Sequence, residues 1–380
     1  MALSAKEKLL HKILTYYTDS PSGFTVQDCA GLIQVNRSVI SHYLNRLCDD
    51  GRLRKENTRP VRFFVQHNST PQALPSRLVS KKEDAFQKLI GAQGSLTDAI
   101  ALCRSAVDYP GNGLPILIAG ESGVGKSHLA TLIYQYAVER KVIAADKPFV
   151  ELNCADYANN PELLSATLFG YTRGAFTGAD RDKHGAFDDA DGGFLFLDEV
   201  HRLSAENQEK LFLFMDKGYF YRLGDNRNRH PASLRFIFAT TENIDTVLLN
   251  TFRRRIPVRV TLPNYISRPL TERVAQIGYF LQQEAVSLRR DIHLENQLMH
   301  QLVSSPVRGN IGELKNQIKV MCASAWSDNR DADVITLHGT PPGGEILVIS
   351  ASKPDHNIDA SMLLPKAMRD DVIFREFCHS

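Results

Sequence analysis

A short glycine-rich stretch constrains the fold of this chain more than any other feature. Residues 120–127 read GESGVGKS and match the phosphate-binding pattern G-x-x-x-x-G-K-[ST], known as Walker A. The apolar run 114–119 precedes this stretch and a helical pattern begins near Lys126, so it lies between a strand and a helix, as the pattern requires. Glycines let such a loop turn its N–H groups toward phosphate oxygens. The alternative is a chance glycine-rich turn.

Two residues of this loop have expected roles of their own. Lys126 would reach the β- and γ-phosphates of ATP, and the hydroxyl of Ser127 would hold Mg²⁺. The other loop positions would surround the phosphates: Gly120, Glu121, Ser122, Gly123, Val124 and Gly125.

An acidic strand end supplies the second half of the expected site. Residues 193–199 read GFLFLDE, an apolar strand that ends in Asp198 and Glu199. Ligands of parallel sheets bind at this carboxyl edge. Asp198 would position the Mg²⁺ shell, and Glu199 would polarise the attacking water. Alone, such an end could be a solvated strand terminus; beside the phosphate-binding loop, the catalytic interpretation is favoured.

Strand-like and helical segments alternate from residue 83 to about residue 262. The apolar runs 116–119, 149–152, 194–197 and 236–239 are separated by helical stretches, which predicts an α/β fold with a parallel sheet covered by helices. Residues 270–327 are mostly helical and would form a smaller lid. We therefore expect an ATPase core at 88–262, a helical lid at 263–335 and an unassigned segment at 336–380.

The N-terminal region has a different character. Three helical patterns and a basic hairpin predict a winged helix-turn-helix at 1–66, followed by a polar linker at 67–87. Lys and Arg are in excess over residues 1–82, whereas the rest is net acidic, which indicates double-stranded DNA as a partner. The alternatives are a protein-docking module or a solvated charged surface. Helix 37–49 would enter the major groove and present Arg37, Ser38, Ser41, His42, Asn45 and Arg46.

Composition narrows the class of protein further. No apolar run approaches the ~18–20 residues that span a membrane, and the start lacks the apolar core of a secretory signal. The six cysteines lie far apart without a C-x-x-C pair, which disfavours disulfides and zinc and favours a cytoplasmic location.

One further stretch carries a family resemblance. Residues 168–179 read LFGYTRGAFTGA, which resembles the GAFTGA signature of bacterial enhancer-binding proteins. These AAA+ ATPases activate the sigma-54 form of RNA polymerase. The resemblance covers about residues 88–327 and implies ATP hydrolysis with Mg²⁺, a homo-oligomeric ring such as a hexamer, and sigma-54 polymerase as partner. The implied contact residues are Gly174, Ala175, Phe176, Thr177, Gly178 and Ala179.

The resemblance also implies roles in catalysis. Asn153 matches the asparagine that restrains the catalytic glutamate, with a buried strand-end hydrogen bond as the alternative. Thr241 falls at the γ-phosphate sensor, where the family usually carries asparagine. Arg255 matches an arginine finger that reaches the nucleotide of a neighbouring subunit.

Some positions depart from the family pattern. Leu249 stands at the first finger position, and Gly312 stands where the lid usually places an arginine that touches nucleotide. These departures, with DNA binding placed before the ATPase, resemble the LevR-like branch. That branch regulates sugar-uptake and sugar-catabolism operons and usually adds phosphotransferase-system regulatory domains, which are expected to be missing here.

The sequence thus predicts a sigma-54-dependent activator that remodels polymerase through ATP hydrolysis. One alternative is a DNA-binding regulator that binds ATP only as a switch. Others are a truncated, non-activating fragment, or a different AAA+ remodeller such as a helicase loader or unfoldase, which would leave residues 174–179 unexplained.

Overall fold

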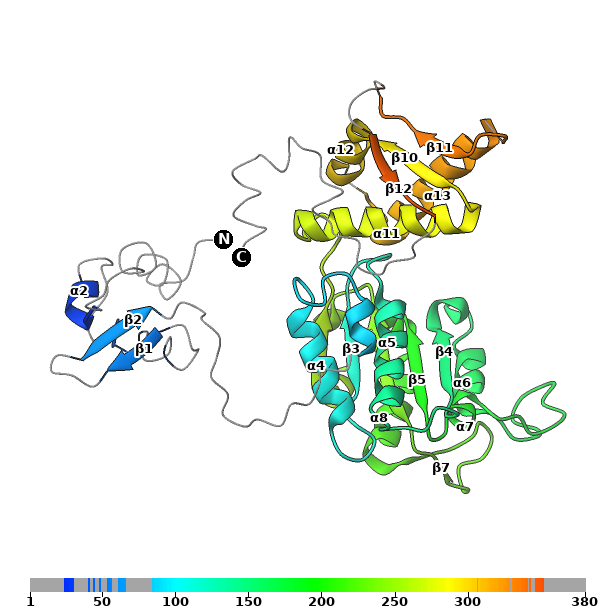
Figure 1. The fold of residues 1–380 in the computed structure, drawn as a ribbon. Helices are drawn as coiled ribbons and strands as arrows, with labels where there is room; N and C mark the ends of the chain where they lie inside the picture. Colours follow the sequence, from blue (N-terminus) through cyan, green and yellow to red (C-terminus); the bar gives the residue numbers. More distant parts are fainter. Residues whose placement is uncertain are drawn as a thin grey trace. The chain divides into compact units, whose positions relative to one another are not determined.

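The structure, a computed structural model, describes residues 24–30, 40–41, 44, 48, 53–56, 61–65, 84–305, 307–328, 330–340, 342 and 346–351. The chain divides into two compact units, Met1–Ser80 and Lys81–Ser380 (Figure 1). Within the described part, no helix is long and apolar enough to cross a membrane.

In the N-terminal unit, a short helix and a hairpin surround a small core. Helix α2 is Val26–Ala30, and strands β1 (Leu53–Glu56) and β2 (Arg62–Val65) pair antiparallel. Ile40 and Leu44 are helical and pack with Phe24 and Phe63 in this core. The hairpin lies within the expected basic stretch. Of the expected DNA-binding residues, Ser41 is described and half-buried; Arg37, Ser38, His42, Asn45 and Arg46 lie outside the described residues.

The second unit is built on the expected parallel sheet. Its strands are β3 (Ile116–Ala119), β4 (Phe149–Asn153), β5 (Phe194–Asp198), β8 (Arg235–Thr240) and β9 (Val258–Thr261). They lie in the order β4-β5-β8-β3-β9, and all neighbours are parallel. The inner strands β3, β5 and β8 are mainly apolar because both faces of the sheet are covered there, whereas the outer strands β4 and β9 expose Glu151, Arg259 and Thr261.

Helices bury the two faces of this sheet separately (Figure 1). Alternate strand residues such as Ile118 and Phe196 pack with α4 (Thr97–Asp108) and α5 (Lys126–Glu139). Their neighbours Leu117 and Leu197 face the opposite core. The helices of that second face are α6 (Pro161–Phe169), α7 (Ala186–Asp189), α8 (Ala205–Lys217) and α10 (Asn250–Arg253).

Short elements complete this core. They are η1 (Ala85–Lys88), η2 (Cys154–Tyr157), η3 (Val200–Arg202), α9 (Ile244–Val247) and the strands β6 (Tyr219–Phe220) and β7 (His230–Pro231), which pair with each other.

The lid contains a sheet that the sequence analysis did not predict. The expected helices are present as α11 (Leu270–Leu288), α12 (Asn296–Ser304) and α13 (Asn310–Asp328). They accompany strands β10 (Asp291–Glu295), β11 (Val334–Leu337) and β12 (Ile346–Ile349), in the order β11-β10-β12 (Figure 1). Strand β12 lies in the segment left unassigned, and its Ile349 is buried in the lid core. The lid is therefore not purely helical and extends past 335.

Candidate active site at the carboxyl edge of the sheet

The phosphate-binding loop joins β3 to α5 and is shaped by glycines. Gly123 has φ +76° and Gly125 has φ +104°, conformations that residues with a Cβ rarely adopt. Lys126 is buried, and its Nζ donates to the backbone carbonyls of Gly120 and Glu121, each at 3.0 Å. Burial lowers the pKa of Lys126, opposed by the charges of Glu199 and Asp198. The ammonium group of Lys126 thus holds the loop through the loop's own backbone carbonyls. It can exchange these hydrogen bonds for hydrogen bonds to phosphate oxygens.

The two carboxylates of the acidic strand end lie beside this loop. Asp198 ends β5, next to Asn153 on β4 in the strand register. The hydroxyl of Ser127 donates to Oδ2 of Asp198 at 3.4 Å. A hydroxyl and a carboxylate side by side are oxygen donors of the kind that Mg²⁺ accepts together with nucleotide phosphates. Ser127 and Asp198 therefore fit the ion that the sequence predicted for them.

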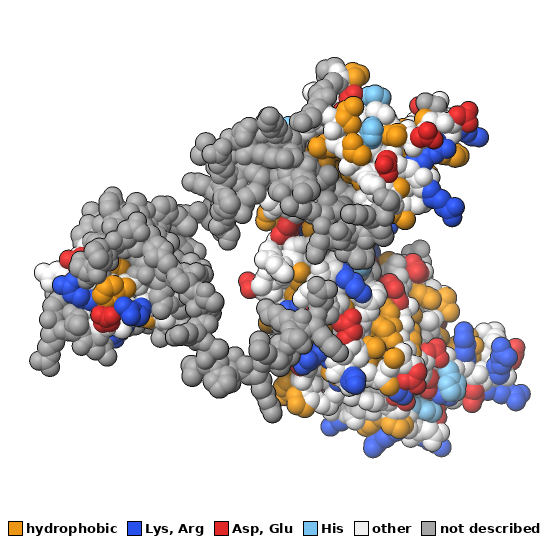
Figure 2. Space-filling view, viewed as in Figure 1, with side chains coloured by type: hydrophobic (Ala, Val, Ile, Leu, Met, Phe, Trp, Pro, Cys, Tyr) orange, Lys and Arg blue, Asp and Glu red, His pale blue; other side chains and the backbone are white. Residues whose placement is uncertain are grey.

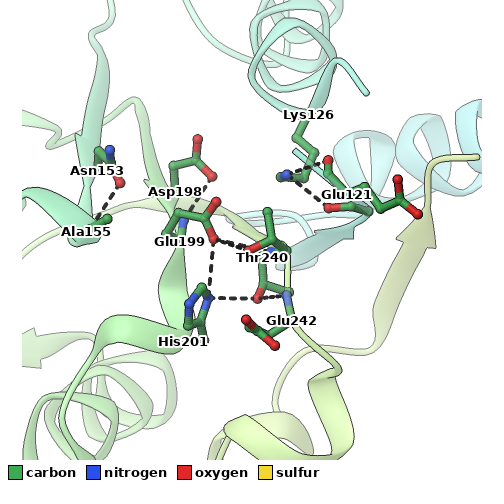
Figure 3. A network of polar contacts seen from close by, with 11 residues as sticks. Glu121, Lys126, Asn153, Ala155, Asp198, Glu199, His201, Thr240 and Glu242 are labelled. Carbon is green, nitrogen blue, oxygen red and sulfur yellow. Dashed lines mark hydrogen bonds and ion pairs between the residues drawn. The ribbon is translucent and has the colours of Figure 1, made fainter. Parts of the chain in front are cut away.

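Glu199 occupies a constrained position. Its φ of +48° is left-handed, which is uncommon for a residue other than glycine. Its Oε2 accepts a hydrogen bond from the hydroxyl of Thr241 at 2.9 Å and another from the Thr241 backbone N–H at 3.2 Å. The Nδ1 of His201 lies 3.3 Å from the same oxygen (Figure 3). The carboxylate is thus held by the end of β8 and by the turn that follows β5.

Asn153 is engaged elsewhere. Its Oδ1 accepts from the backbone N–H of Ala155 at 3.0 Å (Figure 3). Its Nδ2 donates to Asp156 at 3.2 Å. The described partners of this half-buried amide therefore lie in η2, which it caps, and not on Glu199. His201, which does contact Glu199, was missed from sequence because a single histidine after an acidic pair carries no distinctive pattern.

Arg255 lies on the surface near α8. Its guanidinium donates to both carboxylate oxygens of Asp216, at 2.8 and 2.6 Å, and stacks over the ring of Phe212. This hydrogen-bonded pair raises the pKa of Arg255 and lowers the pKa of Asp216. Bidentate pairing fixes the direction of the guanidinium. Of its neighbours, Arg253 pairs with Asp245.

The lid touches the phosphate-binding loop directly. The backbone N–H of Gly312 donates to the carbonyl of Gly123 at 3.1 Å. The side chain of Asn310 donates to Oε2 of Glu121 and to the carbonyl of Ser122, both at 3.0 Å, and accepts from the backbone N–H of Tyr265 at 2.9 Å. Hydrogen bonds from Asn310 and Asn264 lower the pKa of Glu121. Gly312 stands where the family usually has a lid arginine. At this position the lid therefore contacts the phosphate-binding loop through its backbone and not through a long side chain.

The loop between α6 and α7 protrudes from the core at the lower right of Figure 1. Gly174 and Gly178 have positive φ, and open space surrounds the position of a Cβ at each. The tip is closed by a hydrogen bond from the Gly174 N–H to the Ala179 carbonyl at 2.8 Å. Phe176 is 43% exposed and packs edge-on against Tyr171, with ring centroids 4.9 Å apart.

Two further features surround this tip. Charged side chains of both signs gather over the protruding loop in Figure 2, and Arg173, Asp180, Arg181 and Lys183 are exposed there. Residues of the tip, among them Ala175, Phe176 and Thr177, also line a cleft of about 900 Å³ with α6 and α8. An exposed aromatic ring on a glycine-hinged loop can contact a partner without rearrangement of the core.

Fold and site together define an α/β P-loop ATPase fold of the AAA+ type, with a lid. Its chain trace is similar to the crystal structure of NtrX from Brucella abortus, with TM-score 0.52 and 26% identity over 66% of this chain and 56% of that chain.

Comparison with known sequences narrows the class. Residues 89–263 match the family described as Sigma-54 interaction domain. The chain is 35% identical over 362 residues to the transcriptional regulatory protein LevR of Bacillus subtilis, covering 87% of this chain and 38% of LevR. It is 39% identical over 344 residues to the transcriptional regulatory protein DagR of Salmonella typhimurium, covering 86% of this chain and 37% of DagR. The chain belongs to the sigma-54-dependent transcriptional activators, and it spans well under half the length of these two relatives.

Proposed function

We propose that this chain hydrolyses ATP and uses the energy to remodel sigma-54 RNA polymerase. The observation that carries the proposal is the meeting of Lys126, Ser127, Asp198 and Glu199 at one sheet edge. A crystal structure of NtrX in complex with ATP has a similar fold, which supports ATP as the nucleotide. Such a regulator would act in the bacterial cytoplasm, where its polymerase is found.

The chemistry follows from the side chains present. Lys126 would leave the carbonyls of Gly120 and Glu121 and bind the β- and γ-phosphates. Ser127 and Asp198 would hold Mg²⁺, which neutralises phosphate charge when bound. Glu199 would accept a proton from the attacking water, and Thr241 would contact the γ-phosphate. Arg255, released from Asp216, would reach the nucleotide of a neighbouring subunit in a ring, which we propose to be a hexamer.

The exposed loop 174–179 would couple this chemistry to the polymerase. Phe176 and Thr177 would contact sigma-54 in some nucleotide states, while a winged helix-turn-helix at 1–66, joined by a linker, holds an upstream DNA site. The expected linker 67–87 is too long at its end, because Ala85 and Phe86 of η1 are buried in the core. The ATPase core would therefore include η1 and extend to about residue 262, with the lid following it. The resemblance to the LevR-like branch supports target operons of sugar uptake or catabolism.

Substitutions at the loop and at the site separate the two activities. Thr177→Ala should retain ATPase activity and abolish open-complex formation by sigma-54 polymerase, whereas Thr177→Ser, which keeps the hydroxyl, should retain both. Lys126→Ala should abolish nucleotide binding, with the exposed Lys88→Ala as the charge-matched control. Parent-like activation by Thr177→Ala would contradict the role of the loop.

A second function, ATP binding as a switch without turnover, is favoured by the lid. Gly312 meets the loop through its backbone and has no side chain to supply a lid cation. Steady-state phosphate release at high protein concentration distinguishes the two functions. Release that rises cooperatively with protein concentration supports the hydrolytic ring, and no release supports the switch.

A further inference from the structure

All the contacts described above for the Glu199 carboxylate are made by one of its oxygens, Oε2. The hydroxyl of Thr241 donates to it at 2.9 Å, and the backbone N–H of the same residue donates at 3.2 Å. His201 Nδ1 lies 3.3 Å away. A carboxylate only accepts hydrogen bonds, so the neutral imidazole that suits this contact carries its proton on Nδ1. Oε2 is thus held from two sides, by β8 and by η3.

The histidine is itself held in place. Its side chain is 8% exposed, and its Nδ1 also lies 3.1 Å from the hydroxyl of Thr240, which is fully buried. That hydroxyl accepts from the backbone N–H of Glu242 at 3.1 Å. Burial lowers the pKa of His201, against the raising effect of Glu199. A neutral, buried ring with two polar partners has a fixed orientation, which suits it to position Glu199.

The strand that ends just before Thr241 also borders the phosphate-binding loop. The N–H of Gly120 donates to the carbonyl of Thr240 at 3.2 Å, and β8 pairs with β3 through Ala119 and Thr240. Thr241, the next residue, therefore stands between the loop that would hold the phosphates and the carboxylate that would activate water. Its single hydroxyl proton can be donated to one acceptor at a time.

We propose that Thr241 and His201, instead of Asn153, position Glu199, and that the γ-phosphate competes with Glu199 for the hydroxyl of Thr241. The inference rests on the proposed function, because it concerns the same nucleotide site. In the structure the hydroxyl of Thr241 donates to Glu199. Arrival of a γ-phosphate withdraws that hydroxyl, and Oε2 of Glu199 keeps its contacts with the Thr241 backbone N–H and with His201 while it gains room to accept a hydrogen bond from water. Sensing of the phosphate and release of the base become one event.

A double-mutant cycle on nucleotide affinity tests the competition without requiring hydrolysis. The full chain is titrated with AMP-PNP and with ADP as parent, Glu199→Ala, Thr241→Val and the double variant. Removing the carboxylate also removes a negative charge near the phosphates, which raises the affinity for nucleotide. This gain in affinity is the same in the Thr241→Val background. The cycle isolates the remaining part, which depends on the hydroxyl.

Glu199→Ala should tighten AMP-PNP about tenfold more in the parent than in Thr241→Val, as expected for a hydrogen bond to a charged group. ADP, which has no γ-phosphate, should show less than about twofold coupling. Thr241→Ser should restore the coupling, and Asn153→Ala should leave it intact. Coupling below twofold for AMP-PNP, or its loss in Asn153→Ala, would overturn the inference. If the cycle shows the coupling but the parent releases no phosphate from ATP, only the hydrolytic function is refuted. If the parent binds no AMP-PNP, both the hydrolytic function and this inference are refuted.

The role of His201 has its own test. His201→Leu should lower kcat for ATP about tenfold with KM changed less than twofold, because the base is misplaced while the phosphate contacts remain. His201→Asn, whose amide can donate from near the position of Nδ1, should recover most of kcat. Equal loss in both variants with a matching loss of thermal stability would assign the histidine a structural role only.

Discussion

The contact between the lid and the phosphate-binding loop leads to a prediction at Gly123. A methyl group at this position would overlap with the backbone carbonyl of Gly309 in the lid, and φ is +76°. Gly174 on the exposed loop provides a matched control, because its φ is +82° and open space surrounds its Cβ position. Gly123→Ala and Gly174→Ala therefore share the backbone cost and differ in the clash.

The expected magnitudes follow from these two contributions. Left-handed backbone costs an L-residue roughly 1–2 kcal/mol, and this applies to both variants. Forcing a methyl group into a packed site adds about 1–3 kcal/mol, and this applies to Gly123→Ala alone. The neighbouring atom is backbone, so the lid must shift as a unit and the hydrogen bond from Gly312 to Gly123 is strained or lost.

The chain offers a direct optical probe for this effect. Trp326 is the one tryptophan in the sequence and lies on α13, the helix that begins at the contact. Its fluorescence should report urea unfolding of the lid, and the midpoint of Gly123→Ala should fall about 1 M further than that of Gly174→Ala. Coincident midpoints for the two variants would refute the argument that the lid packs against this loop.

Further predictions concern Arg255 and the buried cysteines. Arg255→Ala should lower ATPase activity at ring-forming protein concentrations by about 10³-fold with nucleotide binding retained, since a finger acts on the neighbouring site; Arg253→Ala serves as control, and the reverse pattern would reassign the finger. Burial raises the pKa of Cys103, Cys154 and Cys322 to about 12, so at pH 8 these thiols stay protonated. Iodoacetamide should label them slowly until urea is added, as peptide mass spectrometry can measure; fast labelling of the folded chain would contradict their burial.

The parts of this molecule that sequence predicts well are those encoded locally. The loop 120–127 and the inner strands can each be recognised from a run of consecutive residues, because a strand buried on both faces needs an unbroken apolar run. The glycines of loop 174–179 likewise mark a tip that requires positive φ. Each of these features depends on neighbours in the chain.

The parts that escaped the sequence depend on contacts between distant residues. Strand β12 joins β10 across a long separation, and four-residue apolar runs such as Ile346–Ile349 occur in helices as well as strands. Asn310 meets Glu121 from the other end of the domain, and no local pattern links them. The side chain of Asn153 had two possible hydrogen-bond partners, Glu199 and a group at the strand end, and in the structure it accepts from the nearby backbone N–H of Ala155. Propensity alone does not rank such competing partners.

The central claim is that nucleotide state controls the access of Phe176 to sigma-54. A photo-crosslinking phenylalanine analogue placed at position 176 of the full chain tests it, with the same analogue at the exposed Tyr109 as control. In mixtures with sigma-54 polymerase and promoter DNA, position 176 should crosslink to sigma-54 with AMP-PNP and much less with ADP, and position 109 should not. Absence of that crosslink in every nucleotide state would contradict the account.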